Sequence, residues 1–205
     1  MCSSGLVPGD APAALGDADG RGEPSDEVPP SASGRPCDPA VSTDASLPAS
    51  TSGLDVIAAP TIVGRVDLDR LSQRLRSVIA ACAPAHTVAR LTVRLVDDAE
   101  MSELHARHFG DPSTTDVVTF PASSPGEPVD ADLACCVDEA ARQAATRGHD
   151  LDDEVLLYAV HGLLHCMGHD DRDPAAFERM HAEEDRLLTA IGVGPRFAPA
   201  KGASR

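Results

Sequence analysis

The chain is 205 residues long and carries a formal net charge of −16, with 42% hydrophobic and 24% charged residues. This length allows one domain plus a tail. The large negative charge excludes a protein whose whole surface attracts nucleic acid. No stretch is long enough to cross a bilayer, which excludes a membrane-spanning protein.

Residues 1–53 differ in composition from the rest of the chain. They are rich in Pro, Ser, Gly, Ala and Asp, and they contain no aromatic residue. Eight acids and two bases give this segment a net charge of −6, which leaves −10 of the total −16 for the remainder. Such a segment buries too little apolar surface to offset the entropy of ordering it. We therefore expect a disordered acidic tail at 1–53, one domain at 54–193 and a short C-terminal tail at 194–205.

Cysteine usage and the first residues indicate the compartment. Six Cys occur without a Cys-x-x-Cys pair, and the opening Met-Cys-Ser-Ser-Gly lacks the basic start of a secretory signal. We expect a reduced, cytoplasmic protein.

Hydrophobic periodicity and capping residues divide the domain into elements. Leu91, Val93 and Leu95 alternate with polar residues, as in a half-exposed strand. Asp67 is a typical helix N-cap, and Gly110 is typical of a helix end. In chain order we predict a strand at 54–59, a helix at 67–82, a strand at 87–96, a helix from Asp97 or Asp98 to His108, strands at 116–121 and 132–137, a helix at 138–147, a helix from Asp150 to about Gly168, and a helix at 174–191.

This order of elements indicates an α+β fold. We expect a small, mostly parallel mixed sheet of about four strands, packed against about five helices.

The segment His161-Gly-Leu-Leu-His165-Cys-Met-Gly168-His169-Asp170-Asp171 has the spacing of a metal site. His161 and His165 are four residues apart, so on a helix both imidazoles leave the same face. Zinc sites present two ring nitrogens in this way. The neighbouring residues are apolar almost all round, so the helix should be buried and its imidazoles need partners. A shared cation would supply one partner to both.

A third ligand can come from the turn that follows. Gly168 tolerates the left-handed conformation that reverses the chain at a helix end. Both His169 and Asp171 are then candidates, since imidazole nitrogen and carboxylate oxygen both bind zinc. Asp170 is better suited to orienting an imidazole, and Cys166 should point away from the His161/His165 face. No residue is assigned as a general base.

The motif resembles the signature of the YbeY family of bacterial rRNA-maturation endoribonucleases, His-Gly-x-Leu-His-x-x-Gly-x-Asp-His. Two further segments are similar to family motifs and follow in the family's order. Thr115-Asp116-Val-Val-Thr-Phe120-Pro121 resembles its Thr-Asp-Val-Leu-Ser-Phe-Pro strand, and Ala131-Asp132-Leu resembles its Gly-Asp-Ile/Leu strand start. The signature is matched by His161, Gly162, Leu164, His165, Gly168 and Asp170, while Asp171 stands at the register of the family's third zinc-binding His.

The resemblance implies a zinc-dependent endoribonuclease that is specific for single-stranded RNA and acts in 16S rRNA 3′-end maturation and ribosome quality control. It implies one Zn²⁺ ion, with His161, His165 and Asp171 as the ligands favoured by register. The implied partners are rRNA and the small ribosomal subunit, with no membrane and no DNA.

Two other functions remain open. One is a ribosome assembly factor without catalysis, whose zinc is structural. The other, with less support, is a zinc metalloprotease. Zinc proteases with His-x-x-x-His on a helix place a Glu directly after the first His as general base. Here that position is Gly162, so the motif delivers no such base.

RNA contact requires a local basic surface in so acidic a chain. Arg90 and Arg94 on one strand face are candidates, and surface ion pairs with the many acids are the alternative role. Asp116 and Asp132 are expected to be turn or cap residues. Two further candidates, Arg70 and Arg74, share one helix face. The acids expected on the solvated face of the last helix are Glu178, Glu183, Glu184 and Asp185.

Overall fold

In the computed structural model of this chain, residues 5–6 and 53–197 are described. The segment 1–53, expected to be disordered, lies outside these residues except for 5–6 and 53, which belong to strands, and most of the expected C-terminal tail also lies outside them.

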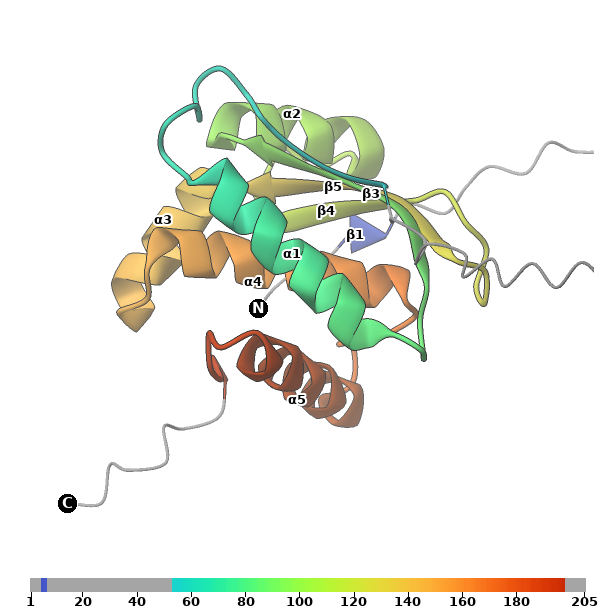
Figure 1. Cartoon of the computed structure of the whole chain (residues 1–205). Coiled ribbons are helices and arrows are strands. Elements are labelled where there is room, and N and C mark those ends of the chain that lie inside the picture. Colours follow the sequence, from blue (N-terminus) through green and yellow to red (C-terminus); the bar gives the residue numbers. More distant parts are fainter. Residues whose placement is uncertain (1–4, 7–52, 198–205) are drawn as a thin grey trace, which may run out of the picture. The chain divides into compact units, whose positions relative to one another are not determined.

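A mixed, mostly parallel sheet forms the centre of the domain (Figure 1). Four longer strands pair in the order β4-β5-β3-β2, and a two-residue strand, β1, extends the sheet beside β4. All neighbours are parallel except β4 and β5, which are antiparallel. The predicted sheet is therefore confirmed. The strands are β1 (Gly5–Leu6), β2 (Gly53–Ala58), β3 (Val88–Val96), β4 (Val117–Pro121) and β5 (Val129–Cys136).

Five helices accompany the sheet, as predicted. The N-cap of the first helix follows the expected chemistry, since the carboxylate of Asp67 accepts a hydrogen bond from the Arg70 amide at 3.0 Å. Gly110 ends the second helix in the left-handed conformation, with a φ of 73°. The helices are α1 (Leu68–Cys82), α2 (Asp98–Phe109), α3 (Val137–Arg147), α4 (Leu151–Cys166) and α5 (Pro174–Ala190).

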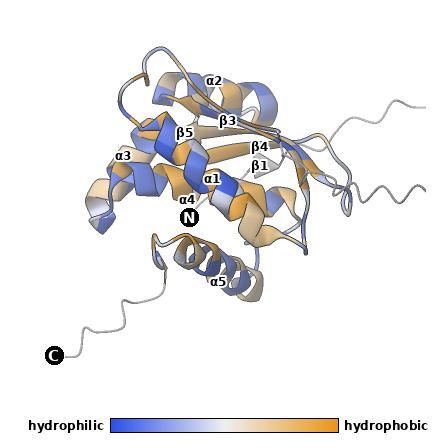
Figure 2. Cartoon of the chain, in the orientation of Figure 1, coloured by the Kyte–Doolittle hydropathy of each residue, from blue (hydrophilic) through white to orange (hydrophobic). Residues whose placement is uncertain are grey.

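The two faces of the sheet carry separate hydrophobic clusters. α2 covers one face, while α1 and α4 cover the other, and α5 packs beyond them (Figure 1). The adjacent residues Cys135 and Cys136 point to opposite faces, as expected for a strand, and belong to the two different clusters. α1 alternates between hydrophilic and hydrophobic residues, as a helix with one solvated side does (Figure 2).

α4 lies between the sheet and α5 and is the most deeply buried helix. Every residue from Glu154 to Leu164 is buried. The helix approaches the sheet closely at Gly162, where an added Cβ would lie 3.1 Å from Val117 Cγ2 and 3.2 Å from Thr119 Cγ2. Glycine at this position therefore sets the depth at which α4, and the two histidines on it, sit against the strands.

Among the described residues, no helix combines the length and the apolar character that a bilayer crossing needs.

Candidate metal centre

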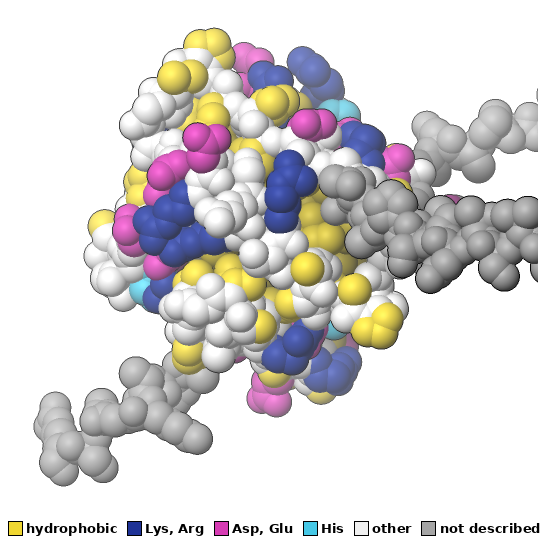
Figure 3. All heavy atoms as spheres, viewed as in Figure 1, with side chains coloured by type: hydrophobic (Ala, Val, Ile, Leu, Met, Phe, Trp, Pro, Cys, Tyr) yellow, Lys and Arg dark blue, Asp and Glu magenta, His cyan; other side chains and the backbone are white. Residues whose placement is uncertain are grey.

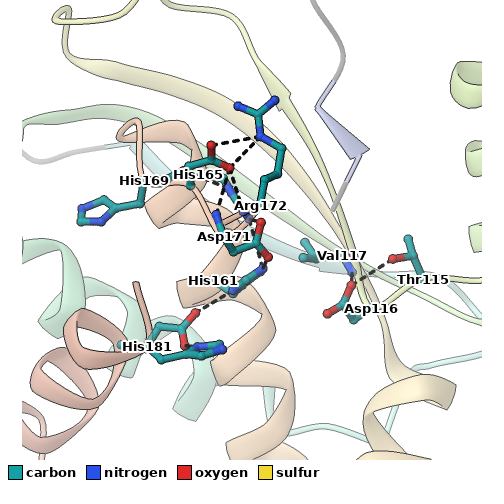
Figure 4. A network of polar contacts seen from close by, with 11 residues as sticks. Thr115, Asp116, Val117, His161, His165, His169, Asp171, Arg172 and His181 are labelled. Atoms are coloured by element: carbon teal, nitrogen blue, oxygen red, sulfur yellow. Dashed lines mark hydrogen bonds and ion pairs between the residues drawn. The ribbon is translucent and has the colours of Figure 1, made fainter. Parts of the chain in front are cut away.

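The side chains of His161, His165 and Asp171 converge at the C-terminal end of α4 (Figure 4). The two imidazole Nε2 atoms lie 3.1 Å apart. From the loop after the helix, Asp171 places Oδ2 3.8 Å from Nε2 of His161 and Oδ1 3.9 Å from Nε2 of His165. One potential ligand atom from each residue lies within 4.8 Å of the others. The structure thus brings together the three residues that the motif grouped.

The loop that delivers Asp171 is held by its own hydrogen bonds. Gly168 adopts a φ of 92°, and the carboxylate of Asp170 accepts hydrogen bonds from the amides of Asp171 at 2.9 Å and Arg172 at 3.2 Å. The Arg172 guanidinium also bonds this carboxylate and holds the pKa of Asp170 at about 2. Asp170 therefore shapes the loop. The expectation that it orients an imidazole is wrong.

His169 contributes its backbone. Its carbonyl accepts a hydrogen bond from Nδ1 of His165 at 3.0 Å. Its imidazole turns away from Asp171 (Figure 4) and faces the ring of His86, with 6.3 Å between the ring centroids. Of the two candidates for a third ligand, the geometry favours Asp171.

Glu184 on α5 is the functional residue that sequence reasoning placed wrongly. It was expected on a solvated face, yet its side chain is fully buried. Oε1 accepts a hydrogen bond from Nδ1 of His161 at 2.6 Å, and Oε2 accepts one from Nδ1 of His181 at 2.6 Å. A signal was available: on α5, Glu184 lies in the same stripe as the buried residues Met180, Leu187 and Leu188.

These contacts fix which nitrogen of each imidazole carries the proton. A carboxylate and a carbonyl can only accept, so Nδ1 of His161 donates to Glu184 and Nδ1 of His165 donates to His169. Both Nε2 atoms then present lone pairs to each other and to the Asp171 carboxylate. Three electron-pair donors directed at one point can hold a cation between them, and the donor set suits a divalent metal ion.

The pKa shifts agree with such a cation. Burial lowers the pKa of His161, but its hydrogen bond to Glu184 and the negative charges of Glu184, Asp116 and Asp171 outweigh burial, so the pKa is raised. Burial and the charge of His161 lower the pKa of His165. Burial raises the pKa of Glu184, but the hydrogen bonds and charges of His161 and His181 lower it by more, so the pKa is lowered overall and the carboxylate is ionised. The negative charges around His161 therefore favour a cation at this site.

Two cavities adjoin the cluster. One, of about 530 Å³, lies among α3, α4, α5 and the segment before β4, and His161 and Glu184 line it. The other, of about 880 Å³, is lined by His165 and by the loop between β4 and β5. Cys166 is half-buried and packs against the hydrophobic core, as expected. Asp116 lines the first cavity, and its carboxylate accepts hydrogen bonds from the Val117 amide and the Thr115 hydroxyl at the start of β4.

The arginines proposed for RNA contact all have acidic partners. Arg90 pairs with Asp130 at 2.6 Å and with Asp132 at 2.5 Å, which gives Asp132 an ion-pairing role within the strand in place of the expected turn or cap. The face in Figure 3 shows basic side chains scattered singly or in small groups, several beside acids. The other pairs are Arg94–Glu100 at 2.6 Å, Arg74–Asp153 at 2.6 Å and Arg70–Asp152 at 3.8 Å.

Comparisons with known proteins agree on one family. A family model described as Endoribonuclease YbeY matches residues 61–192. Endoribonuclease YbeY of Thermobifida fusca is 36% identical over 131 residues, which are 60% of this chain and 84% of that protein. The protein of that name from Micrococcus luteus is 37% identical over 139 residues, 64% of this chain and 88% of that protein. The one from Halorhodospira halophila is 43% identical over 109 residues, 50% of this chain and 71% of that protein.

Proposed function

Because the chain belongs to the YbeY endoribonuclease family, we propose that it is a zinc-dependent endoribonuclease that cuts single-stranded RNA. In this proposal it acts in 16S rRNA 3′-end maturation and in ribosome quality control. The observation that carries the metal-dependent part is the convergence of His161, His165 and Asp171, each presenting an electron pair to the same point.

Zinc is the proposed ion because two imidazoles and one carboxylate form a typical zinc donor set. Nitrogens that share a tetrahedral zinc lie about 3.3 Å apart, close to the 3.1 Å between the two Nε2 atoms. Such an ion supplies an acidified water and a positive charge beside a phosphodiester. Glu184 and the carbonyl of His169 keep the protons on the Nδ1 atoms, so both Nε2 lone pairs stay available.

The number of ligands supports a catalytic zinc over a structural one. Structural zinc sites have four protein ligands almost without exception, whereas catalytic sites have three and keep one position open. Within residues 53–197, three donors form the cluster. This favours the enzyme over an assembly factor with a structural zinc.

The packing of Gly162 argues against a metalloprotease. An added Cβ at this position meets Val117, Thr119 and Leu133 of the sheet at 3.1 to 3.3 Å. The position that carries the general base in zinc proteases is therefore directed into the core. A Glu there would have to displace three buried side chains.

The proposed partners are rRNA and the small ribosomal subunit, in the cytoplasm, and neither DNA nor a membrane. The four cysteines in the described part of the chain are free thiols, which supports a reducing compartment.

Cleavage of a precursor RNA tests the proposal. Full-length protein loaded with zinc is incubated with an RNA that contains the 16S 3′ end and has both duplex and unpaired segments. We expect cuts in unpaired segments only, loss of cleavage with a chelator, and recovery on adding zinc. His161→Ala should be inactive, whereas the matched control His169→Ala should cleave, because the His169 ring is turned away from the cluster.

Three results would contradict the proposal. Cleavage that persists in His161→Ala would place the activity outside this site. Zinc retention and binding to small subunits without cleavage would support the assembly factor. Casein hydrolysis that His161→Ala abolishes would support the protease.

A further inference from the structure

The cavity of about 530 Å³ beside His161 has an aromatic wall formed by Phe177, His181 and Phe197. The rings of His181 and Phe197 are stacked, with centroids 3.7 Å apart and 16° between the planes. Phe177 meets His181 edge-on at 4.0 Å. Phe177 and Phe197 are 46% and 36% exposed, which is unusual for large apolar side chains in the described part of this chain. Exposed aromatic rings beside a cavity are suited to stacking on a flat ligand.

Tyr158 supplies a second, independent observation. It lines the same cavity and is only 5% exposed. Its hydroxyl forms no hydrogen bond with any residue of 5–6 or 53–197. The hydroxyl therefore opens onto the cavity, where a molecule that fills the cavity can form a hydrogen bond with it.

The charges around the cavity argue against an anion as the occupant. Arg147 lines it, but its guanidinium is paired with the buried carboxylate of Glu154 at 2.6 Å. Two acidic residues, Asp116 and Glu139, also line the cavity. A flat, uncharged group with polar edges fits this lining, and a phosphate does not.

The aromatic wall is directly connected to the proposed metal site. Glu184 joins His181 of the wall to His161 of the cluster through two hydrogen bonds of 2.6 Å. His161 itself lines the cavity. Because only a sugar separates a nucleotide's base from its phosphate, a phosphate at the cluster would bring the neighbouring base to this wall.

We propose that the cavity binds one unpaired nucleobase next to the scissile phosphate, stacked against Phe177 and the His181/Phe197 pair and hydrogen-bonded to Tyr158. This inference rests on the proposed function and identifies the part of the RNA that the cavity binds. It also gives a physical reason for cutting single strands, because a base can turn into such a cavity only where it is unpaired.

A double-mutant cycle that combines variants of the protein with RNAs lacking one base tests the inference. The substrates are a single-stranded oligoribonucleotide and a set of versions that each lack one base near the cut. In the wild-type, zinc-loaded full-length protein, loss of the base that occupies the cavity should lower kcat/KM at least about fivefold. Phe177→Ala and Tyr158→Phe should each lower kcat/KM on the intact RNA and be less sensitive than the wild type to the loss of that same base, because each variant lacks one of the contacts that the base makes. The matched control is Ile57→Ala, since Ile57 on β2 is also 46% exposed.

Tyrosine fluorescence gives a direct readout of occupancy. Tyr158 is the single tyrosine of the chain, which has no tryptophan. We expect the intact oligoribonucleotide to quench its emission and the version without the critical base to quench it much less. Free tyrosine at the same RNA concentration corrects for absorbance by the RNA.

The two proposals fail in different ways. If the wild-type protein cuts no RNA, the proposed function fails. The same proteins and RNAs are then compared by their binding affinity and by Tyr158 emission in place of kcat/KM. If the effects of the base and of Phe177→Ala simply multiply, or if no base changes Tyr158 emission, the nucleobase site is overturned whether or not the RNA is cut. Unfolding temperatures and zinc content equal to wild type show that the variants are folded and loaded.

Discussion

The three residues of the cluster could be grouped from the sequence because they are local. His161 and His165 share one helix face, and Gly168 turns the chain so that Asp171 returns to that face within a few residues. Glu184 could not be found by spacing alone, because it reaches His161 from another helix. On α5 it stands among other acids, and only its place in the buried stripe distinguishes it from them.

Removing the charge of Glu184 should weaken metal binding. In Glu184→Gln the amide cannot replace the ionised acceptor that fixes the His161 ring and its proton. Loss of such a partner costs about 10- to 100-fold in metal affinity, which competition with a coloured zinc chelator measures. Glu183→Gln is the matched control, because Glu183 pairs with Arg186 and does not contact the histidines. Equal affinities for both variants would contradict this role.

When the pH is lowered, zinc affinity should begin to decrease at a higher pH than it would for a site made of histidines with their usual pKa. The metal binds neutral imidazole, and the pKa of His161 is raised above its usual 6.5, so protons compete with the metal already above that pH. The pKa of His165 is lowered, so it competes only at lower pH. The affinity should therefore begin to fall above the usual imidazole pKa of 6.5 in the wild type, and the onset should move to lower pH in Glu184→Gln. An onset at the same pH in both proteins would be inconsistent with the part assigned to Glu184.

At the scale of elements, capping and periodicity predicted the type and order of all nine strands and helices from residue 53 onward. The largest difference lies at the start of β5, which begins at Val129 and not at 132. Asp130 is a turn-forming residue type, but in β5 it pairs with Arg90 of the adjacent strand. A cross-strand ion pair of this kind depends on register, which the sequence of one strand does not reveal.

Gly162→Ala should destabilise the protein even though alanine favours helices. The helical preference is worth about 1 kcal/mol, but overpacking a core costs about 1–3 kcal/mol. Val117 and Thr119 are branched, buried and stiff, so they cannot easily move away from the new methyl group. We expect the free energy of unfolding, measured in urea, to fall by about 1 kcal/mol. Ala182→Gly, at an exposed position of α5, measures the difference in helix preference between alanine and glycine without a packing contribution. A Gly162→Ala protein that is more stable than the wild type would show that α4 is not closely packed against Val117 and Thr119.

For the whole molecule, the net charge predicts that basic residues form no general RNA-binding surface, and the four candidate arginines all have acidic partners. The ion pairs of the four arginines proposed for RNA contact depend on the fold and could not be predicted, because their partners lie on other elements, as Asp153 of α4 does for Arg74 of α1. The cavity could not be predicted from the sequence either, because its lining combines Phe177, Phe197 and Tyr158 from three separate segments.

RNA binding should depend only weakly on salt. Each phosphate contact with a single strand contributes a slope of about −0.7 in log affinity against log salt. With most described arginines already paired to carboxylates, we expect few such contacts. The affinity of the zinc-loaded protein for a short single strand should therefore fall by less than about tenfold between roughly 50 and 200 mM salt. A loss of several hundredfold, read by fluorescence anisotropy, would show that a basic surface binds the RNA instead.

Metal analysis of the purified full-length protein, set beside RNA cleavage by the same samples, tests the three-residue zinc site most directly. We predict about one zinc ion per chain in the wild type and in His169→Ala, and far less in Asp171→Ala, with cleavage lost in parallel. A wild-type protein that contains no metal, cannot be reconstituted and still cleaves RNA would contradict the account. Zinc that is lost in His169→Ala but kept in Asp171→Ala would contradict the assignment of the third ligand.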